Sequence, residues 1–172
     1  MNSPKTIAEA YIPMTALNTV AFALGTSPEW LKNLIWFESK WNPLARNIFS
    51  SAKGLIQLTD APARELGFAS SADAIEQNPT ATEQLYNIVL PYLTKHKPLN
   101  TEQALYMAVF YPAAQKWNPW KLFPPLVLTK NPGIMTPADY IYRVSGKFPP
   151  VGTAVILLLA GLTTYILKGM KV

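Results

Sequence analysis

Hydrophobic residues recur along most of the chain three or four positions apart, as on one face of an α-helix. No segment shows the sustained apolar and polar alternation of a half-buried β-strand. Over residues 11–25 a signal peptide is an alternative, because Ala21-Phe22-Ala23 resembles a signal-peptidase site, but the helical spacing favours an ordinary helix. The sequence therefore predicts a mainly α protein. Its predicted helices span residues 6–24, 28–41, 60–66, 80–93, 101–110 and 136–145.

The second predicted helix carries a carboxyl group on its apolar face. Ser27 can cap this helix, and Pro28 suits its first position. Because burial disfavours the charged form of a carboxyl group, we expect a raised pKa for Glu38. In the alternative, Glu38 is a surface residue that pairs with Arg46 or Lys40. The residues that share its stripe are Trp30, Leu31, Leu34 and Ile35.

Proline interrupts the chain repeatedly after the helix predicted at residues 101–110. Proline lacks a backbone N–H and disfavours helix in the residue before it, so we expect an irregular segment here. Thr136-Pro137-Ala138-Asp139 then starts a further helix, which runs to about Ser145. The prolines in question are Pro112, Pro119, Pro124, Pro125, Pro132 and Pro137.

The last part of the chain is apolar enough to cross a membrane. Residues 148–167 carry no charge, and a helix of about 20 residues spans the hydrocarbon core of a bilayer. Lys168 and Lys171 follow, where their ammonium groups can reach the lipid headgroups. A buried C-terminal core helix is the alternative. We therefore expect a transmembrane helix over residues 148–168.

Composition narrows the possible chemistry. At 172 residues the chain fits one globular domain with an appended segment. It has no cysteine, which excludes disulfides and thiolate metal sites, and its one histidine, His96, lies between two lysines at a predicted helix end. The net charge of +5 is scattered and accompanies no nucleic-acid-binding motif. It favours contact with anionic envelope surfaces over nucleic acid.

The residues around Glu38 form a motif with several parts. Glu38-Ser39 is followed by Asn42-Pro43 and, after a short loop, by Gly54-Leu55-Ile56-Gln57. This pattern resembles that of the soluble-type lytic transglycosylases, which are related in fold to goose-type lysozyme. The likeness spans roughly residues 24–117, and residues 136–144 look like the closing helix of that family.

The resemblance implies a lysozyme-like fold and a division of the chain into three parts. The expected layout is a transglycosylase domain over residues 1–122 with its N-terminal helix at 6–24, a proline-rich wrapping segment and closing helix over residues 123–147, and the transmembrane helix over residues 148–168.

The resemblance also implies roles for individual residues. Glu38 matches the single acid/base of the family, and Gln57 matches the glutamine that lines the glycan cleft. Tyr111 aligns with the tyrosine of the family's Ala-Tyr-Asn-Ala-Gly element, where its hydroxyl could hold Glu38 or a sugar. No metal or other cofactor is implied. The candidate substrate-binding residues are Gln57, Tyr111, Ser39, Gly54 and Asn47.

Two departures from the family pattern bear on activity. Pro112 and Ala114 replace the Asn and Gly of the tyrosine element, and Asn47 stands near the position where the family often has serine, in a slightly longer loop. These changes leave a catalytically inactive structural relative as an alternative.

Hydrolysis by the two-carboxylate route would require a second acidic residue facing Glu38. No motif supplies one, and Asp60, Glu65 and Asp73 are candidates by elimination only. The resemblance therefore favours cleavage of the β-1,4 bond between MurNAc and GlcNAc in peptidoglycan, with formation of 1,6-anhydro-MurNAc. A hydrolytic muramidase is the other catalytic possibility.

The expected partners are the glycan strands of peptidoglycan and a membrane that the C-terminal helix enters. The small size, the insecure export signal and the apolar tail suggest a membrane-anchored phage virion protein that digests the cell wall locally during entry. Other virion proteins would then be further partners, and nucleic acid would not. A non-catalytic virion or membrane protein is the alternative from a different functional class.

Overall fold

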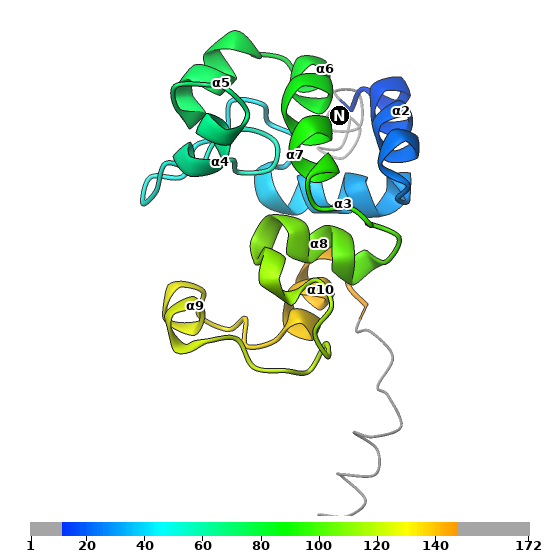
Figure 1. Cartoon of the computed structure of the whole chain (residues 1–172), viewed down its shortest axis with the longest axis vertical. Coiled ribbons are helices and arrows are strands. Elements are labelled where there is room, and N and C mark those ends of the chain that lie inside the picture. Colours follow the sequence, from blue (N-terminus) through cyan, green and yellow to red (C-terminus); the bar gives the residue numbers. More distant parts are fainter. Residues whose placement is uncertain (1–11, 148–172) are drawn as a thin grey trace, which may run out of the picture.

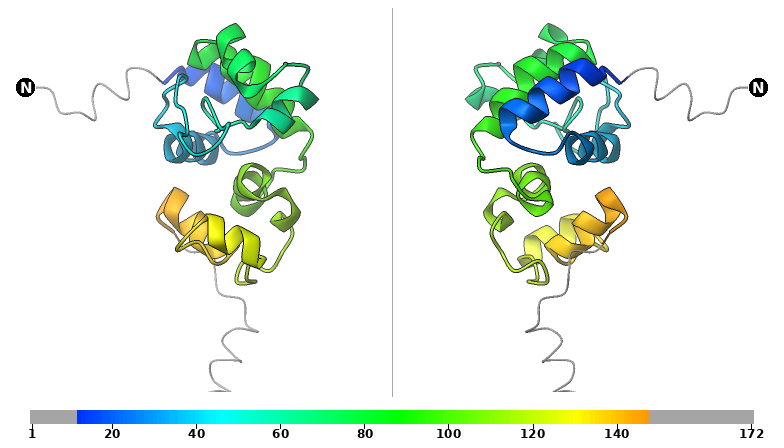
Figure 2. Two further views of the ribbon diagram at one scale, coloured as in Figure 1. Left: turned by 90° about the vertical axis from the view of Figure 1, so that its left-hand side faces the viewer. Right: turned by 90° about the vertical axis from the view of Figure 1, so that its right-hand side faces the viewer.

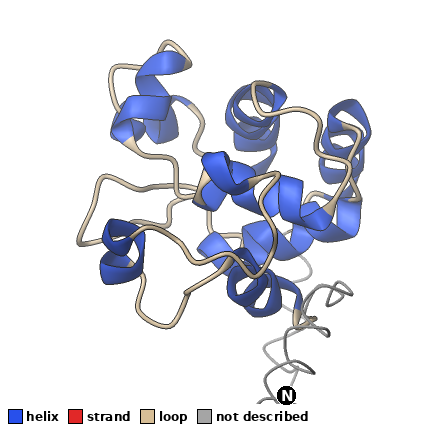
Figure 3. Cartoon of the chain, turned by 60° about the horizontal axis from the view of Figure 1, so that its bottom comes forward, coloured by secondary structure: helices blue, strands red, loops and turns tan. Residues whose placement is uncertain are grey.

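The computed structural model describes residues 12–147 of the chain. Figure 3 shows helices and loops over this range and no strand, and the only β-type pairing in it consists of isolated bridges at Lys53, to Arg46 and to Leu58. The predicted mainly α class is confirmed for these residues. The predicted transmembrane helix at residues 148–168 lies outside the described range, and none of the helices within residues 12–147 has the length and apolar character to cross a bilayer.

The helices form an upper and a lower group in the view of Figure 1, and the side views of Figure 2 show the same division. Helix α3 lies at the boundary, where it contacts α2, α8 and α10. The upper group contains α2 (Met14–Leu24), α3 (Pro28–Ser39), α4 (Asp60–Glu65), α5 (Ser71–Gln77), α6 (Ala81–Gln84), the π-helical turn η1 (Leu85–Val89) and α7 (Leu90–Thr94). The lower group contains α8 (Glu102–Phe110), the 3-10 turn η2 (Pro112–Ala114), α9 (Pro125–Lys130) and α10 (Pro137–Ser145).

Helix α3 ends two residues earlier than the sequence pattern predicts. Lys40 and Trp41 have positive φ angles of 54° and 62°, which end the helix after Ser39. The indole of Trp41 is buried and donates from Nε1 to the carbonyl oxygen of Lys32, 3.3 Å away. The predicted cap by the Ser27 hydroxyl is also wrong, because this side chain makes no capping hydrogen bond.

Two further helix predictions need correction. Helix α2 begins at Met14, with Pro13 as its N-cap, so the predicted helix does not run through residues 12 and 13, and its first part, residues 6–11, lies outside the described range. Helix α5 has no counterpart in the sequence prediction. It is only seven residues long, too short for a helical repeat of apolar residues to stand out. Its start is instead marked by the N-cap Ser70, whose hydroxyl accepts from the backbone N–H of Asp73 at 3.1 Å.

The core links the two groups of helices through α3 and α10. Leu31, Leu34 and Ile35 of α3 are fully buried, as their place on the apolar stripe predicts. Tyr140 of α10 is only 1% exposed and is among the largest fully buried side chains. The predicted start of α10 is confirmed by a reciprocal cap, in which Thr136 and Asp139 satisfy one another's backbone N–H groups. Packing of α10 on α3 brings residues about 100 positions apart in sequence into contact.

Candidate active site

Glu38 is the penultimate residue of α3, at the point where the helix meets the loop to α4. Its side chain is half-buried, whereas the neighbouring Ser39 is buried. The left-handed turn at Lys40 directs the chain away from the helix axis immediately afterwards. Glu38 therefore lies at the edge of the core, where a carboxyl group can be shielded from water and still be reached from outside.

The hydroxyl of Tyr140 donates a hydrogen bond to Oε1 of Glu38. The tyrosine ring is held by two aromatic neighbours: Phe110 stacks on it with ring centroids 4.3 Å apart, and Phe37 meets it edge-on at 5.4 Å. Because Tyr140 is buried and held by these rings, its hydroxyl fixes one carboxyl oxygen of Glu38. Tyr140 is the side chain whose hydrogen bond shifts the pKa of Glu38, and that bond is made to Oε1.

Burial raises the pKa of Glu38 above its ordinary value near 4.5, because desolvation outweighs the opposing effects of the Tyr140 hydrogen bond and the Lys40 charge. Desolvation, followed by the nearby Glu38 carboxyl, also holds the pKa of Tyr140 well above 10. Tyr140 therefore stays a hydrogen-bond donor at physiological pH. A carboxyl group with a raised pKa is suited to general acid catalysis.

Glu38 forms no ion pair with another residue of the described range. Within residues 12–147 the one ion pair joins Lys95 Nζ to Glu65 Oε2 at 3.7 Å, so the alternative in which Glu38 pairs with Arg46 or Lys40 is not observed. The ammonium group of Lys40 lies instead over the ring of Trp36, 5.4 Å from its centroid.

The acidic residues considered as second carboxylates are engaged elsewhere. Asp60 accepts from the backbone N–H and the hydroxyl of Ser71 at 2.9 and 2.8 Å, and these bonds lower its pKa. Asp73 accepts from the side chain of Gln77 and the backbone N–H of Ala69, which lower its pKa too. Glu65 pairs with Lys95. No other carboxylate is among the groups that shift the pKa of Glu38.

Gln57 and Gly54 lie in a tight turn of the loop between α3 and α4. Gly54 has φ +74°, and a Cβ atom there would clash with the side chains of Ile75 and Gln84. Gln57 also has a positive φ, 50°, and its Nε2 donates to the carbonyl oxygen of Gly54 at 3.0 Å. The glycine is thus required by backbone conformation and by packing, and the turn that it permits orients Gln57.

Gln84 holds this loop in place, and the sequence analysis missed it. The side chain is 1% exposed, and its Oε1 accepts from the backbone N–H of Leu55 at 2.9 Å. Its Nε2 donates to the carbonyl oxygens of Pro43 at 2.7 Å and Asn78 at 2.9 Å. The sequence offers one indication of this role: Gln84 stands four positions before the apolar Ile88, on the same face of a helix, and a polar residue on an apolar face requires buried hydrogen-bond partners.

A cavity of about 250 Å³ lies beside Gln57. Pro112, which departs from the family pattern, also lines it, so the structure brings the loop after α3 and the end of α8 to one place. Glu38 is not among the residues that line this cavity. The remaining lining residues are Ile56, Leu58, Thr59, Pro62, Tyr92 and Val109.

The other candidate residues make local contacts. The hydroxyl of Ser39 donates to the carbonyl oxygen of Ile35 within α3, at 3.0 Å. Asn47 is exposed, and its Oδ1 accepts from the backbone N–H of Phe49 at 2.8 Å. The ring of Tyr111 packs edge-on against Trp117, with centroids 5.7 Å apart. The Tyr111 hydroxyl was expected to hold Glu38 or a sugar, and in this structure the hydroxyl that holds Glu38 is that of Tyr140.

One family model matches the segment that contains Glu38. No curated protein and no solved structure matches the chain. The family model described as "Transglycosylase SLT domain" matches residues 17–97, a range that includes Glu38, Gly54, Gln57 and Gln84 and excludes Tyr140. The segment at residues 17–97, with its glutamate at the end of α3 and its glutamine in the following turn, is thus similar to a transglycosylase SLT domain.

Proposed function

We propose that this protein is a peptidoglycan lytic transglycosylase in which Glu38 is the acid and then the base. The observation that carries the proposal is the carboxyl group of Glu38, which is shielded at the end of α3 and held through one oxygen by the buried Tyr140 hydroxyl. The SLT domain that contains Glu38 supports peptidoglycan as the substrate.

In the first step, protonated Glu38 donates its proton from Oε2 to the glycosidic oxygen between MurNAc and GlcNAc. The bond from that oxygen to C1 of MurNAc breaks, and GlcNAc leaves with a free 4-hydroxyl group. The raised pKa keeps a larger fraction of Glu38 protonated near neutral pH than an exposed glutamate would have. The hydrogen bond from Tyr140 to Oε1 leaves Oε2 for this transfer.

In the second step, ionised Glu38 accepts the proton of the C6 hydroxyl of the same MurNAc. The C6 oxygen forms a bond to C1 and closes the 1,6-anhydro ring, while Glu38 returns to its protonated form. No water molecule is consumed, and no second carboxylate is required. This route suits a site in which Asp60, Asp73 and Glu65 are bound to other groups.

Analysis of the products from purified peptidoglycan tests the proposal. The parent protein is expected to release 1,6-anhydro muropeptides, and Glu38→Gln, which keeps an acceptor for the Tyr140 hydroxyl, is expected to release none. Glu76→Gln is the matched control, because it removes an exposed carboxylate on α5 and should leave activity unchanged. Reducing-end products would instead identify a hydrolytic muramidase. Inactivity of the parent protein would favour the non-catalytic structural alternative.

The proposal includes a membrane tether and a place in a phage virion. Its support is the uncharged stretch at residues 148–167, followed by Lys168 and Lys171. The full chain should float with lipid vesicles in a density gradient, whereas a chain without residues 148–172 should remain at the bottom. Mass spectrometry of purified virus particles tests the virion assignment, which fails if the protein occurs only in uninfected cells.

A further inference from the structure

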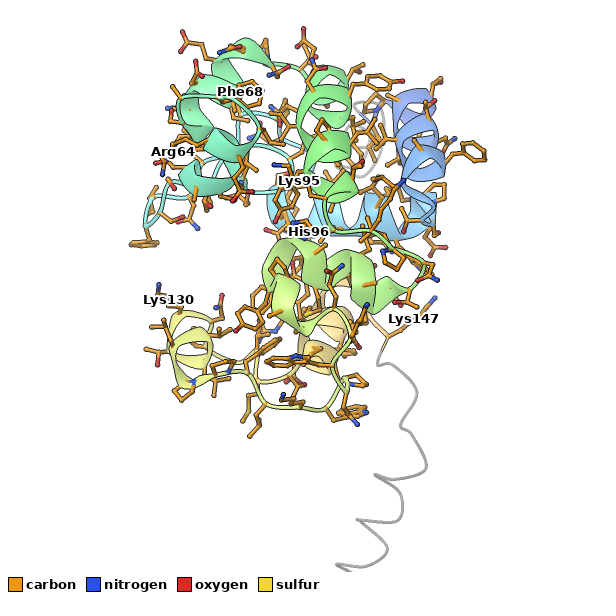
Figure 4. The ribbon with its side chains drawn as sticks, in the orientation of Figure 1. Arg64, Phe68, Lys95, His96, Lys130 and Lys147 are labelled. Atoms are coloured by element: carbon orange, nitrogen blue, oxygen red, sulfur yellow. The ribbon has the colours of Figure 1, made fainter. Side chains whose placement is uncertain are left out.

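A second cavity, of about 370 Å³, is lined by basic residues and by no acidic residue. In Figure 4, Lys95 and His96 lie where the end of α7 approaches α8. Lys97 comes from the segment that connects these helices, and Lys116 from the segment after η2. We call this site the basic cavity.

The positive charge of the basic cavity is only partly compensated. Lys95 pairs with Glu65 at 3.7 Å and also donates to the carbonyl oxygen of Glu65 at 2.9 Å. Lys97 donates to the carbonyl oxygen of Ala23 at 2.7 Å, which leaves its charge unpaired, and Lys116 forms no ion pair within the described residues. An ammonium group has three donors, so Lys97 retains donors for a ligand. Two of the three lysines therefore have no ion-pair partner among residues 12–147.

Side-chain hydrogen bonds fix the walls of the basic cavity. Nε2 of Gln115, which lines the cavity beside Lys116, donates to the carbonyl oxygen of His96 at 2.9 Å and to that of Ala104 at 3.0 Å. The segment that carries Lys116 is thereby tied to α8 and to the end of α7. The cationic groups are thus supported by a backbone that the fold already holds in place.

The basic cavity adjoins the cavity that contains Gln57. Tyr92 lines the Gln57 cavity, and the ring of His96, which lines the basic cavity, packs on Tyr92 with centroids 4.9 Å apart. A ligand bound beside Gln57 would therefore have the basic cavity as its neighbour along α7.

We propose that the basic cavity binds a free carboxylate of the peptide stem of peptidoglycan, so that the protein recognises strands that carry stems over bare glycan. This inference rests on the proposed function. A carboxylate matches ammonium donors through charge-assisted hydrogen bonds. The stem is attached to MurNAc, and a stem of four residues reaches roughly 13–14 Å when extended, which is well beyond the 4.9 Å between the rings of Tyr92 and His96, one from each cavity.

The imidazole of His96 reports on binding directly, because it is the only histidine in the chain. Desolvation lowers its pKa, and a carboxylate bound beside it would raise that pKa. Proton NMR of the full chain in a neutral detergent would follow the imidazole during titration with a disaccharide tetrapeptide. This ligand lacks the MurNAc–GlcNAc linkage that the enzyme would cut, so binding is measured without turnover. We expect a saturable shift, and none with the same disaccharide lacking the peptide.

Two lysine variants separate the basic cavity from overall charge. Lys116→Gln is expected to weaken binding of the disaccharide tetrapeptide about tenfold, the effect of losing one hydrogen bond between charged groups. Lys130→Gln is the matched control: it removes the same charge from α9, away from Lys95 and His96 in Figure 4, and should bind like the parent.

Three results would overturn the inference: equal affinity for the disaccharide without peptide, equal effects of the two variants, or inorganic phosphate binding as tightly as the tetrapeptide. The last would identify an unspecific anion site. None of these results affects release of anhydro products, so the proposed function is judged separately. Unchanged thermal unfolding of Lys116→Gln would show that this exposed substitution leaves the fold intact.

Discussion

Replacing Tyr140 by phenylalanine would remove one hydroxyl group and retain the ring that packs between Phe110 and Phe37. The hydroxyl donates to Oε1 of Glu38 and lowers the pKa of that carboxyl group, against the larger and opposite effect of burial. Without it, the ionised form of Glu38 loses more stabilisation than the protonated form. The pKa of Glu38 should therefore rise further in Tyr140→Phe.

The size of this effect follows from the two charge states of Glu38. A hydrogen bond to an ionised group contributes about 1.5–3 kcal/mol, and one between neutral groups about 0.5–1.5 kcal/mol. The difference, roughly 1–1.5 kcal/mol, changes the protonation equilibrium by about tenfold. Loss of the bond also frees the carboxyl group to rotate, which should lower kcat by up to about 100-fold.

The assay is the pH dependence of kcat/KM for release of anhydro muropeptides. Because the first step requires protonated Glu38, activity falls as pH rises through its pKa, and in Tyr140→Phe this fall should occur at higher pH. Tyr106→Phe is the matched control, since Tyr106 is also buried but its hydroxyl donates to Glu102 at 3.0 Å. A fall at lower pH, or a profile and kcat equal to those of the parent, would refute the assigned role of Tyr140.

Four stability predictions can be checked by thermal or urea unfolding. Ionised Glu38 opposes folding because its pKa is raised in the folded state, so Glu38→Gln should be more stable than the parent at neutral pH, by about 1.4 kcal/mol for each unit of the rise. That gain should disappear below the ordinary value near 4.5, and its persistence there would contradict the assignment. Gln84→Leu should lose roughly 3–5 kcal/mol, because three buried backbone groups lose their partner. Gly54→Ala should lose about 1–3 kcal/mol or more, because its φ is positive and its Cβ would clash. Thr136→Ala should lose about 1 kcal/mol with the cap of α10, and Ser145→Ala, at the other end of that helix, should lose less.

The sequence predicts the elements whose determinants are local. The cap residues at Thr136 and Asp139 identify the start of α10, and the helical phase of Leu31, Leu34 and Ile35 correctly places Glu38 at the edge of the core. Helix α5 escapes prediction because its seven residues are too few for a helical repeat of apolar residues to stand out, although its cap at Ser70 is local.

The site depends on contacts that no local pattern reveals. Tyr140 lies 102 positions after Glu38, and nothing in the spacing of either segment links the two side chains. The alignment of Tyr111 with a family tyrosine pointed to a different hydroxyl group. Gln84 likewise acts on Leu55 across 29 positions. Only the packing of α10 on α3, and of α6 on the loop before α4, determines these partners.

The segment that matches the family model ends at residue 97, whereas Tyr140, which holds the Glu38 carboxyl group, comes 43 residues later. A fragment cut at residue 97 would keep the glutamate and lose Phe110 and Tyr140. It would expose the face of α3 on which α8 and α10 pack, and water would reach the carboxyl group. For protein engineering, the smallest fragment that keeps Glu38 shielded therefore extends at least to the end of α10. Transplanting the recognisable segment alone would transfer an ordinary exposed glutamate in place of a shielded one.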